Sequence, residues 1–303
     1  MSVSLKQIRY FIAAAESGQI SKAAVDLNVS QSAVTAAVQQ LETELGVPLF
    51  KRNPGGVSLT PEGNRFLFHG RNVMAAVSEA VRVPRISGAA AAGTVRVGVT
   101  YTVAGYFLPR HYARFAGNFP KVAVELAEAP RDAIEKALLD GSLDIAVMLV
   151  SNLEARDRLQ SETLLRSRRR LWVPAEHALL QAEHVSLTDV ARYPYVMLTV
   201  DEAETTTGRY WGTSGGEPNV LFRTSSVEAV RSMVAAGMGV TILSDMVYRP
   251  WSLEGQRLER RLLEAEIPTM DVGLAWRRDA ELSPAARAFR EFMGLAHIGE
   301  GQV

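Results

Sequence analysis

The chain has 303 residues, with 33 basic and 33 acidic side chains and no cysteine, so its formal net charge is zero. The absence of cysteine excludes disulfides, a thiol nucleophile, cysteine metal ligands and a thiol redox switch. No apolar run approaches the roughly 20 residues of a membrane helix and no apolar leader follows Met1, so we expect a cytoplasmic protein of two or three domains with no membrane partner.

Two helices are predicted before residue 30. Ser4 and Gln7 have the spacing of a capping box, and the amphipathic helix that they begin ends at Gly18. Ser21 is the predicted cap of a short second helix, and Asn28-Val29 supplies a tight turn after it. A further helix follows, and this order is that of a helix-turn-helix.

The helix that Ser30 caps is the predicted recognition helix. An apolar stripe toward a core is formed by Val34, Val38, Leu41 and Leu45. The other face carries uncharged donors and acceptors, which suit base edges and phosphates in a major groove. The predicted DNA-binding residues up to this point are Ser21, Ser30, Gln31, Ser32, Thr35 and Gln39. A solvated helix face is the alternative interpretation.

Two short strands are predicted directly after this helix, which ends at Gly46. The segments Leu49-Phe50 and Val57-Ser58-Leu59 flank a turn, Asn53-Pro54-Gly55-Gly56. Lys51 and Arg52 are available to DNA phosphates, so the pair of strands is predicted to be a wing.

A long helix is predicted to begin at Thr60-Pro61, with Thr60 as its cap, and to continue to about Val83. It carries an apolar seam of Phe66, Leu67, Gly70, Val73, Met74, Val77 and Val81. The seam is too long to remain exposed to solvent beside a small DNA-binding unit. Pro84 and the Gly88-to-Gly93 stretch indicate a linker after the helix. We therefore expect a homodimer through residues 60–83.

The run from Leu5 to Gly63 resembles the winged helix-turn-helix of the LysR-type transcriptional regulators. The residues that carry the resemblance are Phe11, Ser17-Gly18, Ala23-Ala24, Leu27, Ser30-Gln31-Ser32-Ala33-Val34, Leu41-Glu42, Leu45-Gly46, Leu49-Phe50, Arg52 and Leu59-Thr60-Pro61-Glu62-Gly63. The resemblance implies a DNA-binding domain over 1–63, followed by a dimerisation helix and hinge over 64–92.

Two departures from the family pattern reduce the expected DNA contacts. Thr35 stands where the family usually has Ser, and Ala36-Ala37 replace positions that often carry Arg or Gln. Residues 1–86 hold nine Lys and Arg against six Asp and Glu, so the electrostatic attraction of one head to DNA is modest. In a dimer, the two linked DNA-binding domains would bind paired half-sites, and their binding free energies would add.

The spacing of apolar residues changes after the linker, where predicted strands alternate with helices. Strands are predicted at Thr94–Val99, Val122–Leu126 and Leu143–Val150, with helices between them, which indicates a βαβαβ unit with a parallel sheet. A second such unit is predicted from Tyr195 to Leu243. The fold class is therefore α/β with an N-terminal winged helix-turn-helix, and two α/β halves indicate a clamshell around a small ligand.

The regulatory region of the same family is similar to periplasmic binding proteins, which implies a two-lobed C-terminal domain. The implied boundaries are 93–163 plus 269–296 for the first subdomain and 164–268 for the second, with 297–303 as a tail. A returning strand at Asp271–Trp276 and a helix from Ser283-Pro284 fit this return. Members of the family usually assemble as tetramers, which implies a homotetramer here.

A cleft between the lobes is the expected effector site, because ligands of such sheets lie beyond the carboxyl ends of strands. This rule selects Thr100, Tyr101 and Thr102, with Met148 as a wall, and Thr199, Thr224, Ser225 and Ser226. Helix capping is the other interpretation of these hydroxyls. We hypothesise a small polar effector, with a carboxylate-bearing one as the candidate class, although the sequence places no Arg in the cleft.

The predicted function is transcription regulation by a ligand-responsive DNA-binding protein, with RNA polymerase as a candidate partner. The alternatives are an α/β enzyme and a clamshell small-molecule-binding protein without a DNA-reading role. No convergent catalytic set is visible, and the five histidines lack metal-ligand spacing. We therefore expect no enzyme activity, no cofactor and no metal.

Overall fold

The computed structural model describes residues 3–53, 56–82, 91–213 and 216–297. The chain divides into two compact units, Met1–Ile86 with Leu295–Gly301 and Ser87–Gly294 with Gln302–Val303. Within the described residues no helix combines the length and apolar character that a membrane crossing requires.

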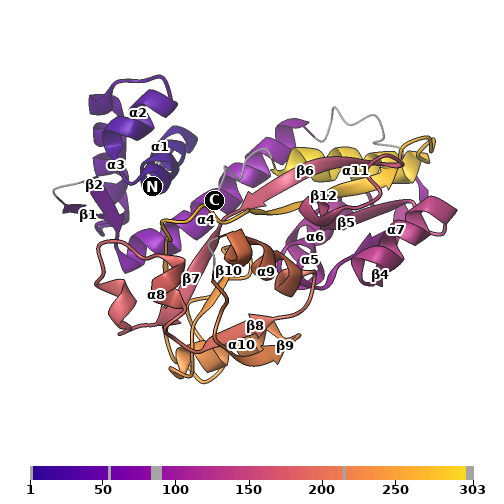
Figure 1. Ribbon diagram of the computed structural model, residues 1–303. Helices are drawn as coiled ribbons and strands as arrows, with labels where there is room; N and C mark the ends of the chain where they lie inside the picture. Colours follow the sequence, from indigo (N-terminus) through magenta and orange to yellow (C-terminus); the bar gives the residue numbers. More distant parts are fainter. Residues whose placement is uncertain (1–2, 54–55, 83–90, 214–215, 298–303) are drawn as a thin grey trace. The chain divides into compact units, whose positions relative to one another are not determined.

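The first unit is the predicted winged helix-turn-helix followed by a long helix (Figure 1). Its elements are α1 (Leu5–Ser17), α2 (Ile20–Asp26), α3 (Gln31–Leu45), β1 (Phe50–Asn53), β2 (Gly56–Leu59) and α4 (Pro61–Arg82). The capping box of Ser4 and Gln7 is present, and α1 ends at Gly18 with a φ of 69°. Ser30 caps α3, and α3 ends at Gly46. These predicted helix ends are confirmed.

The predicted cap at Ser21 is wrong. Helix α2 begins at Ile20, its cap position is Gln19 without a side-chain cap bond, and Ser21 lies exposed inside the first turn. The reason is the tight exit from α1. Gly18 is left-handed (φ 69°) and Gln19 is extended (φ −144°, ψ 129°), so the chain reaches a cap conformation at Gln19, two residues before Ser21.

The core of the first unit joins all of its elements. Phe11 stacks obliquely on Phe50 (ring centroids 5.0 Å apart) and edge-on against Phe66 (5.1 Å). The beginning of α4 therefore packs on its own unit. Farther along α4, Val73 and Val81 are 41% and 57% exposed. Met74 and Val77 are half-buried, so Val73 and Val81 are the uncovered part of the predicted seam.

In the second unit, lobe I (residues 91–167 and 270–294) is built on a five-stranded sheet of order β4-β3-β5-β12-β6. Its strands are β3 (Gly93–Val99), β4 (Val122–Glu128), β5 (Ile145–Leu149), β6 (Leu159–Ser167) and β12 (Met270–Arg277). Strand β3 is parallel to β4 and β5, as predicted, whereas β12 is antiparallel to β5 and β6.

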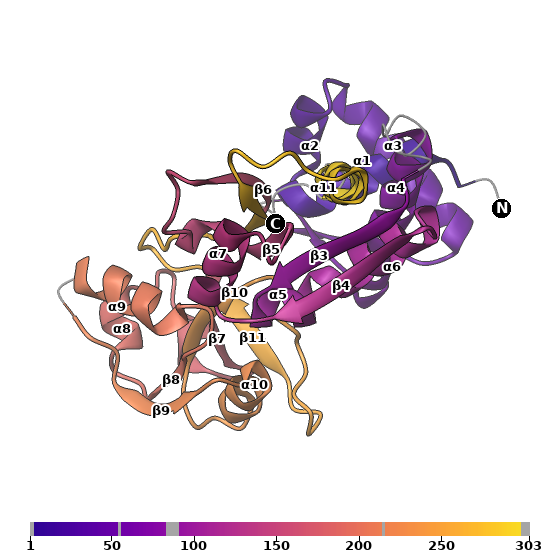
Figure 2. The same ribbon diagram turned by 90° about the vertical axis from the view of Figure 1, so that its right-hand side faces the viewer.

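Helices cover both faces of this sheet (Figure 2). They are α5 (Tyr101–Tyr106), α6 (Leu108–Asn118), α7 (Arg131–Asp140) and α11 (Pro284–His297), with the short 3-10 helix η2 (Val150–Asn152) after β5. Ile134 and Leu138 of α7 pack on Ala146 and Met148. Because side chains alternate along a strand, Val147 faces the other layer, where Phe115 of α6 meets Phe289 of α11 (5.1 Å).

Lobe II (residues 168–269) contains β7 (Arg169–Pro174), β8 (Tyr195–Leu198), β9 (Val220–Thr224), β10 (Thr241–Ser244) and β11 (Leu258–Arg261). Its helices are η3 (Ala178–Leu180), α8 (Leu187–Val190), α9 (Ala203–Thr213) and α10 (Val227–Ala235). Strands β8 and β9 are parallel, as predicted. Strand β10 instead pairs with β7 in antiparallel fashion, and Val240, the residue before β10, forms a parallel bridge with Tyr195 of β8.

The chain crosses from lobe I to lobe II at Arg168, later than the predicted boundary after residue 163. Strand β6 stays in the sheet of lobe I because it pairs with β12 as far as Ser167, opposite Met270. The return crossing lies just before Met270. Both crossings are therefore short and adjacent, which is the geometry of a hinge.

Candidate DNA interface and ligand cleft

Four of the predicted DNA-binding residues line a single hollow of about 400 Å³ on the first unit. Ser21 comes from α2, Gln31 and Thr35 from α3, and Arg52 from the wing, so three elements converge there. The hollow is completed by Gln19, Ile20, Asn53, Gly56 and Val57. The sequence predicted these four residues separately, and the tertiary structure brings them together.

The predicted polar residues of α3 are accessible to a partner. Gln31, Ser32 and Gln39 are exposed, and the Thr35 hydroxyl donates to the carbonyl of Gln31 (2.9 Å), which leaves its oxygen as an acceptor. The Ser30 hydroxyl accepts the Ala33 N–H (3.2 Å), so its principal role here is capping. Lys51 is exposed on β1 but does not line the hollow.

The wing is seated on the end of α1. The N–H of Val57 donates to the carbonyl oxygen of Gly18 (2.8 Å). Gly56 has a φ of 147°, and a Cβ at this position would lie 2.2 Å from the same Gly18 oxygen. Only glycine tolerates both the backbone conformation and the close approach. The position of Arg52 beside the recognition helix depends on this contact.

A carboxylate joins the wing to the recognition helix. Oε1 of Glu42, on α3, accepts the N–H groups of Leu49 (2.6 Å) and Phe50 (3.0 Å) at the beginning of β1. Charged acceptors form stronger hydrogen bonds than neutral ones. Glu42 therefore positions the wing, a role that its place in the family motif did not reveal.

In the second unit, Thr100 lies at the carboxyl end of β3 and at the cap position of α5. Its side chain is 2% exposed, makes no cap bond, and its Oγ1 has no hydrogen-bond partner in the described part of the chain. A buried hydroxyl without a partner is unusual, because it loses its hydrogen bonds to water without replacement. The Thr100 hydroxyl therefore has a hydrogen-bonding capacity that the described residues do not use. Tyr101, beside it, is 39% exposed.

Thr102 is bound by a residue of the opposite lobe. The N–H of Thr102 donates to Oδ2 of Asp201 (2.7 Å), and its hydroxyl donates to the same oxygen. Thr102 is 2% exposed, so its donors are largely withdrawn from solvent. The donors predicted for an effector are therefore already occupied by a carboxylate of the chain itself.

The segment that carries Asp201 is held from lobe I by two further side chains. The amide of Asn152 donates to the carbonyl of Asp201 and to Oε2 of Glu202, both at 3.0 Å. Arg131 of α7 donates to Oε1 of Glu202 at 3.3 Å. Asp201 and Glu202 both have positive φ, 52° and 57°. Such conformations cost of order 1–3 kcal/mol each, so they persist only where other contacts enforce them.

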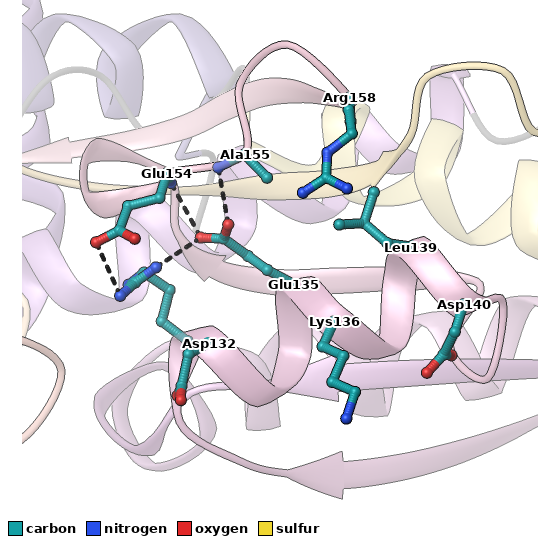
Figure 3. A pocket seen from close by; sticks show the side chains of 9 residues that line it. Asp132, Glu135, Lys136, Leu139, Asp140, Glu154, Ala155 and Arg158 are labelled. Atoms are coloured by element: carbon teal, nitrogen blue, oxygen red, sulfur yellow. Dashed lines mark hydrogen bonds and ion pairs between the residues drawn. The ribbon is translucent and has the colours of Figure 1, made fainter.

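Arg131 belongs to a charged groove of about 530 Å³ along α7 (Figure 3). The buried carboxylate of Glu135 accepts the N–H groups of Glu154 (3.0 Å) and Ala155 (2.8 Å), as well as a bond from Arg131 (3.1 Å). These contacts attach the loop after η2 to α7. The groove thus supports the inter-lobe segment through Arg131, which also pairs with Glu135 and Glu154.

A second contact joins the lobes at the other end of α5. The hydroxyl of Tyr106 donates to Oε1 of Glu228, on α10, at 2.7 Å. Burial and the hydrogen bond to this carboxylate raise the pKa of Tyr106 to about 12. Helix α5 is therefore held at both ends by carboxylates of lobe II.

The other predicted cleft residues have mainly local roles. The Thr224 hydroxyl accepts the Ser226 N–H (3.1 Å), and the Ser226 hydroxyl caps α10 by accepting the Ala229 N–H (3.2 Å). Thr199 and Ser225 are exposed. The proposed wall at Met148 is wrong, because this side chain is fully buried in the core beneath α7. Strand alternation turns it away from the cleft.

Sequence reasoning missed Asp201, Glu202, Asn152, Arg131, Tyr106 and Glu228. One signal was available, since Asp201 and Asn152 each lie two residues after a predicted strand and the strand-end rule applies to them as well. The pairing of Thr102 with a residue 99 positions away had no such signal. Among the described residues no cluster of His, Asp or Glu could hold a metal ion.

Both units match known protein families. Residues 5–64 match the bacterial regulatory helix-turn-helix proteins of the LysR family, and residues 88–296 match the LysR substrate binding domain. The RuBisCO operon transcriptional regulator of Allochromatium vinosum is 30% identical over 298 residues, which cover 97% of this chain and 96% of that protein.

Two full-length solved structures extend the comparison. HinK, a LysR family transcriptional regulator from Pseudomonas aeruginosa, is 26% identical, with a TM-score of 0.62 and coverage of 97% of this chain and 98% of its own. Full-length CbnR in complex with its target DNA is 21% identical, with a TM-score of 0.54 and coverage of 97% and 99%. The second likeness is one of fold.

Proposed function

Because this chain belongs to the LysR family of transcriptional regulators, which bind DNA and an effector in separate domains, we propose that the hollow between α2, α3 and the wing reads its operator. The convergence of Ser21, Gln31, Thr35 and Arg52 carries this proposal. Gln31 and Thr35 would meet base edges, and Arg52 would bind a phosphate. Lys51, Ser32 and Gln39, which are exposed, would add peripheral contacts.

The effector in this proposal is a small polar molecule that binds between the lobes at Thr100. The buried Thr100 hydroxyl without a partner supports this position. Tyr101 and Thr199 are exposed near the ends of β3 and β8 and would contact the same molecule, with Ser225 at the end of β9. Thr224 and Ser226 support the turn beneath them.

Dimerisation through α4 completes the proposed mechanism. The exposed Val73 and Val81 are suited to a partner helix, because a long apolar stripe gains stability when another copy removes it from water. Closure of the lobes around an effector would change the spacing of two heads, and a coupling of about 1–3 kcal/mol would change DNA affinity about 5- to 150-fold. Assembly as a dimer of dimers, contact with RNA polymerase and a cytoplasmic location accompany the proposal.

Footprinting tests this function. Purified protein is applied to the DNA upstream of its own gene and of the adjacent divergent gene at a stated salt concentration, because phosphate contacts make affinity salt-dependent. We expect an extended, two-part protected region. Absence of protection by folded, oligomeric protein at either site would overturn the proposal for this DNA, and the alternative of a clamshell binding protein without DNA reading would then stand.

A further inference from the structure

Asp201 lies at the contact between the lobes and binds Thr102 as the carboxylate of a ligand would. Its Oδ2 accepts both the N–H and the hydroxyl of Thr102, and these two groups come from the opposite lobe. Its other oxygen, Oδ1, has no partner within the described residues. In the proposed cleft, an effector would therefore meet the acceptor oxygen Oδ1 of Asp201. Without Asp201 it would meet the N–H and hydroxyl donors of Thr102.

The placement of Asp201 is enforced rather than incidental. Asn152 binds its carbonyl and the neighbouring Glu202 carboxylate, and Arg131 binds that carboxylate as well. Asp201 and Glu202 hold left-handed backbone conformations, which side chains other than glycine rarely adopt. Asn152 and Arg131 of lobe I thus favour the conformation in which the Asp201 carboxylate reaches Thr102.

We propose that Asp201 is the specificity-determining residue of the effector cleft, acting as an internal carboxylate that excludes small anions from Thr102 and favours an effector with a donor group. This inference rests on the proposed effector cleft. An effector carboxylate at Thr102 would have to displace Asp201 and to lie beside Glu202 as a like charge. An ammonium, amide or hydroxyl donor of the effector would instead pair with the free Oδ1. The carboxylate-bearing class expected from the sequence is therefore disfavoured at this position.

The exchange of Asp201 for an external carboxylate tests the proposal in the full-length protein. Asp201→Ala removes the internal ligand and leaves a space lined by the Thr102 donors. The probe is acetate, compared with chloride at equal ionic strength. We expect Asp201→Ala to lower the Tm by about 4 °C and acetate to restore much of the loss. The Tm of the unchanged protein should be the same in acetate as in chloride.

Two matched variants make the result specific. Asp189 of lobe II also accepts the N–H and hydroxyl of one residue on a single oxygen, those of Ser186, but within α8 and away from the lobe contact. Asp189→Ala should lower Tm without a response to acetate. The double variant Asp201→Ala, Thr102→Val should lose the acetate response, because the hydroxyl donor is gone and its space is filled.

The proposal is overturned if acetate shifts the unchanged protein and Asp201→Ala equally, or if Asp201→Ala shows no acetate response. If Asp201→Ala does not fold, Asp201→Asn provides the test, since its amide oxygen still accepts from Thr102 while the charge is lost. Acetate should then shift the Tm of Asp201→Asn, relative to chloride, at a lower concentration than it shifts the Tm of the unchanged protein. Shifts at equal concentrations would contradict the proposal. None of these measurements uses DNA, so a failed footprint and a failed acetate exchange remain distinguishable.

Discussion

The hydroxyl of Tyr106 donates a 2.7 Å hydrogen bond to the carboxylate of Glu228, and this bond links lobe I to lobe II. Behind it, Arg231 pairs with Glu228, donates to the carbonyl of Val247 (2.6 Å) and lies over the ring of Trp172 (5.9 Å). The Arg231 side chain is only 3% exposed. One end of the lobe contact is therefore anchored by a buried cation.

Acid should weaken this contact. Burial alone would raise the pKa of Glu228, but the hydrogen bonds from Arg231 and Tyr106 outweigh it and hold the pKa below the ordinary 4.5. A depressed folded-state pKa contributes stability that is present above 4.5 and is lost as the pH falls through the folded value. We expect the Tm to fall over this interval, and Glu228→Gln to reduce that part of the fall.

Thermal unfolding curves of Glu228→Gln and of the unchanged protein, recorded from neutral pH to below 4.5, test this prediction. At neutral pH, Glu228→Gln should already be less stable, because the buried Arg231 loses its carboxylate. Tyr106→Phe, which keeps the ion pair and removes one hydrogen bond, is the milder control. Parallel acid profiles for Glu228→Gln and the unchanged protein would contradict the assignment.

Base reading by α3 predicts a specific effect of Gln31→Ala. Loss of its contacts should cost about 1–3 kcal/mol on the cognate operator and little on random DNA. The matched control is Gln40→Ala, because Gln40 is also exposed on α3 but lies half a turn round the helix from Gln31. Fluorescence anisotropy at one salt concentration measures both. Equal losses on the two DNAs would show that Gln31 does not read bases.

The seat of the wing predicts that Gly56→Ala is more damaging than Gly46→Ala. Both positions have positive φ, but a Cβ at Gly56 meets the Gly18 oxygen at 2.2 Å, whereas a Cβ at Gly46 meets nothing within 4 Å. Gly46→Ala should therefore cost only the backbone penalty of roughly 1 kcal/mol. Gly56→Ala should also displace the wing and lower operator affinity. Denaturant unfolding and anisotropy separate the two effects, and equal affinities would exclude the proposed seat.

The uncovered part of α4 predicts that Val73→Asp weakens self-association. A charge placed in an apolar helix contact loses its hydration without a partner. Asn72→Asp adds the same charge at the preceding exposed polar position and is the control. Sedimentation equilibrium should show a lower association constant for Val73→Asp alone. If both variants assemble as the unchanged protein does, α4 is not the dimer contact.

Local signals accounted for most of the first unit. The Ser4 and Gln7 capping box, the left-handed Asn28 turn and the Ser30 cap each depend on residues within a few positions of one another. Such features are encoded by short stretches, and the family resemblance ordered them. The error at Ser21 arose because Gln19 already has the extended backbone of a cap position without a side-chain cap bond, which residue preferences at caps do not predict.

The sequence by itself determined the winged helix-turn-helix and the presence of two α/β lobes, since these follow from periodicity, caps and turns, but it did not predict the pairing of β10 with β7. Only the tertiary structure decided which polar groups meet. The contact between Thr102 and Asp201 spans 99 positions and depends on strand ends, hinge position and two left-handed residues together. The tertiary structure also decided that Met148 lies in the core, because strand register sets the face of the sheet on which each side chain lies.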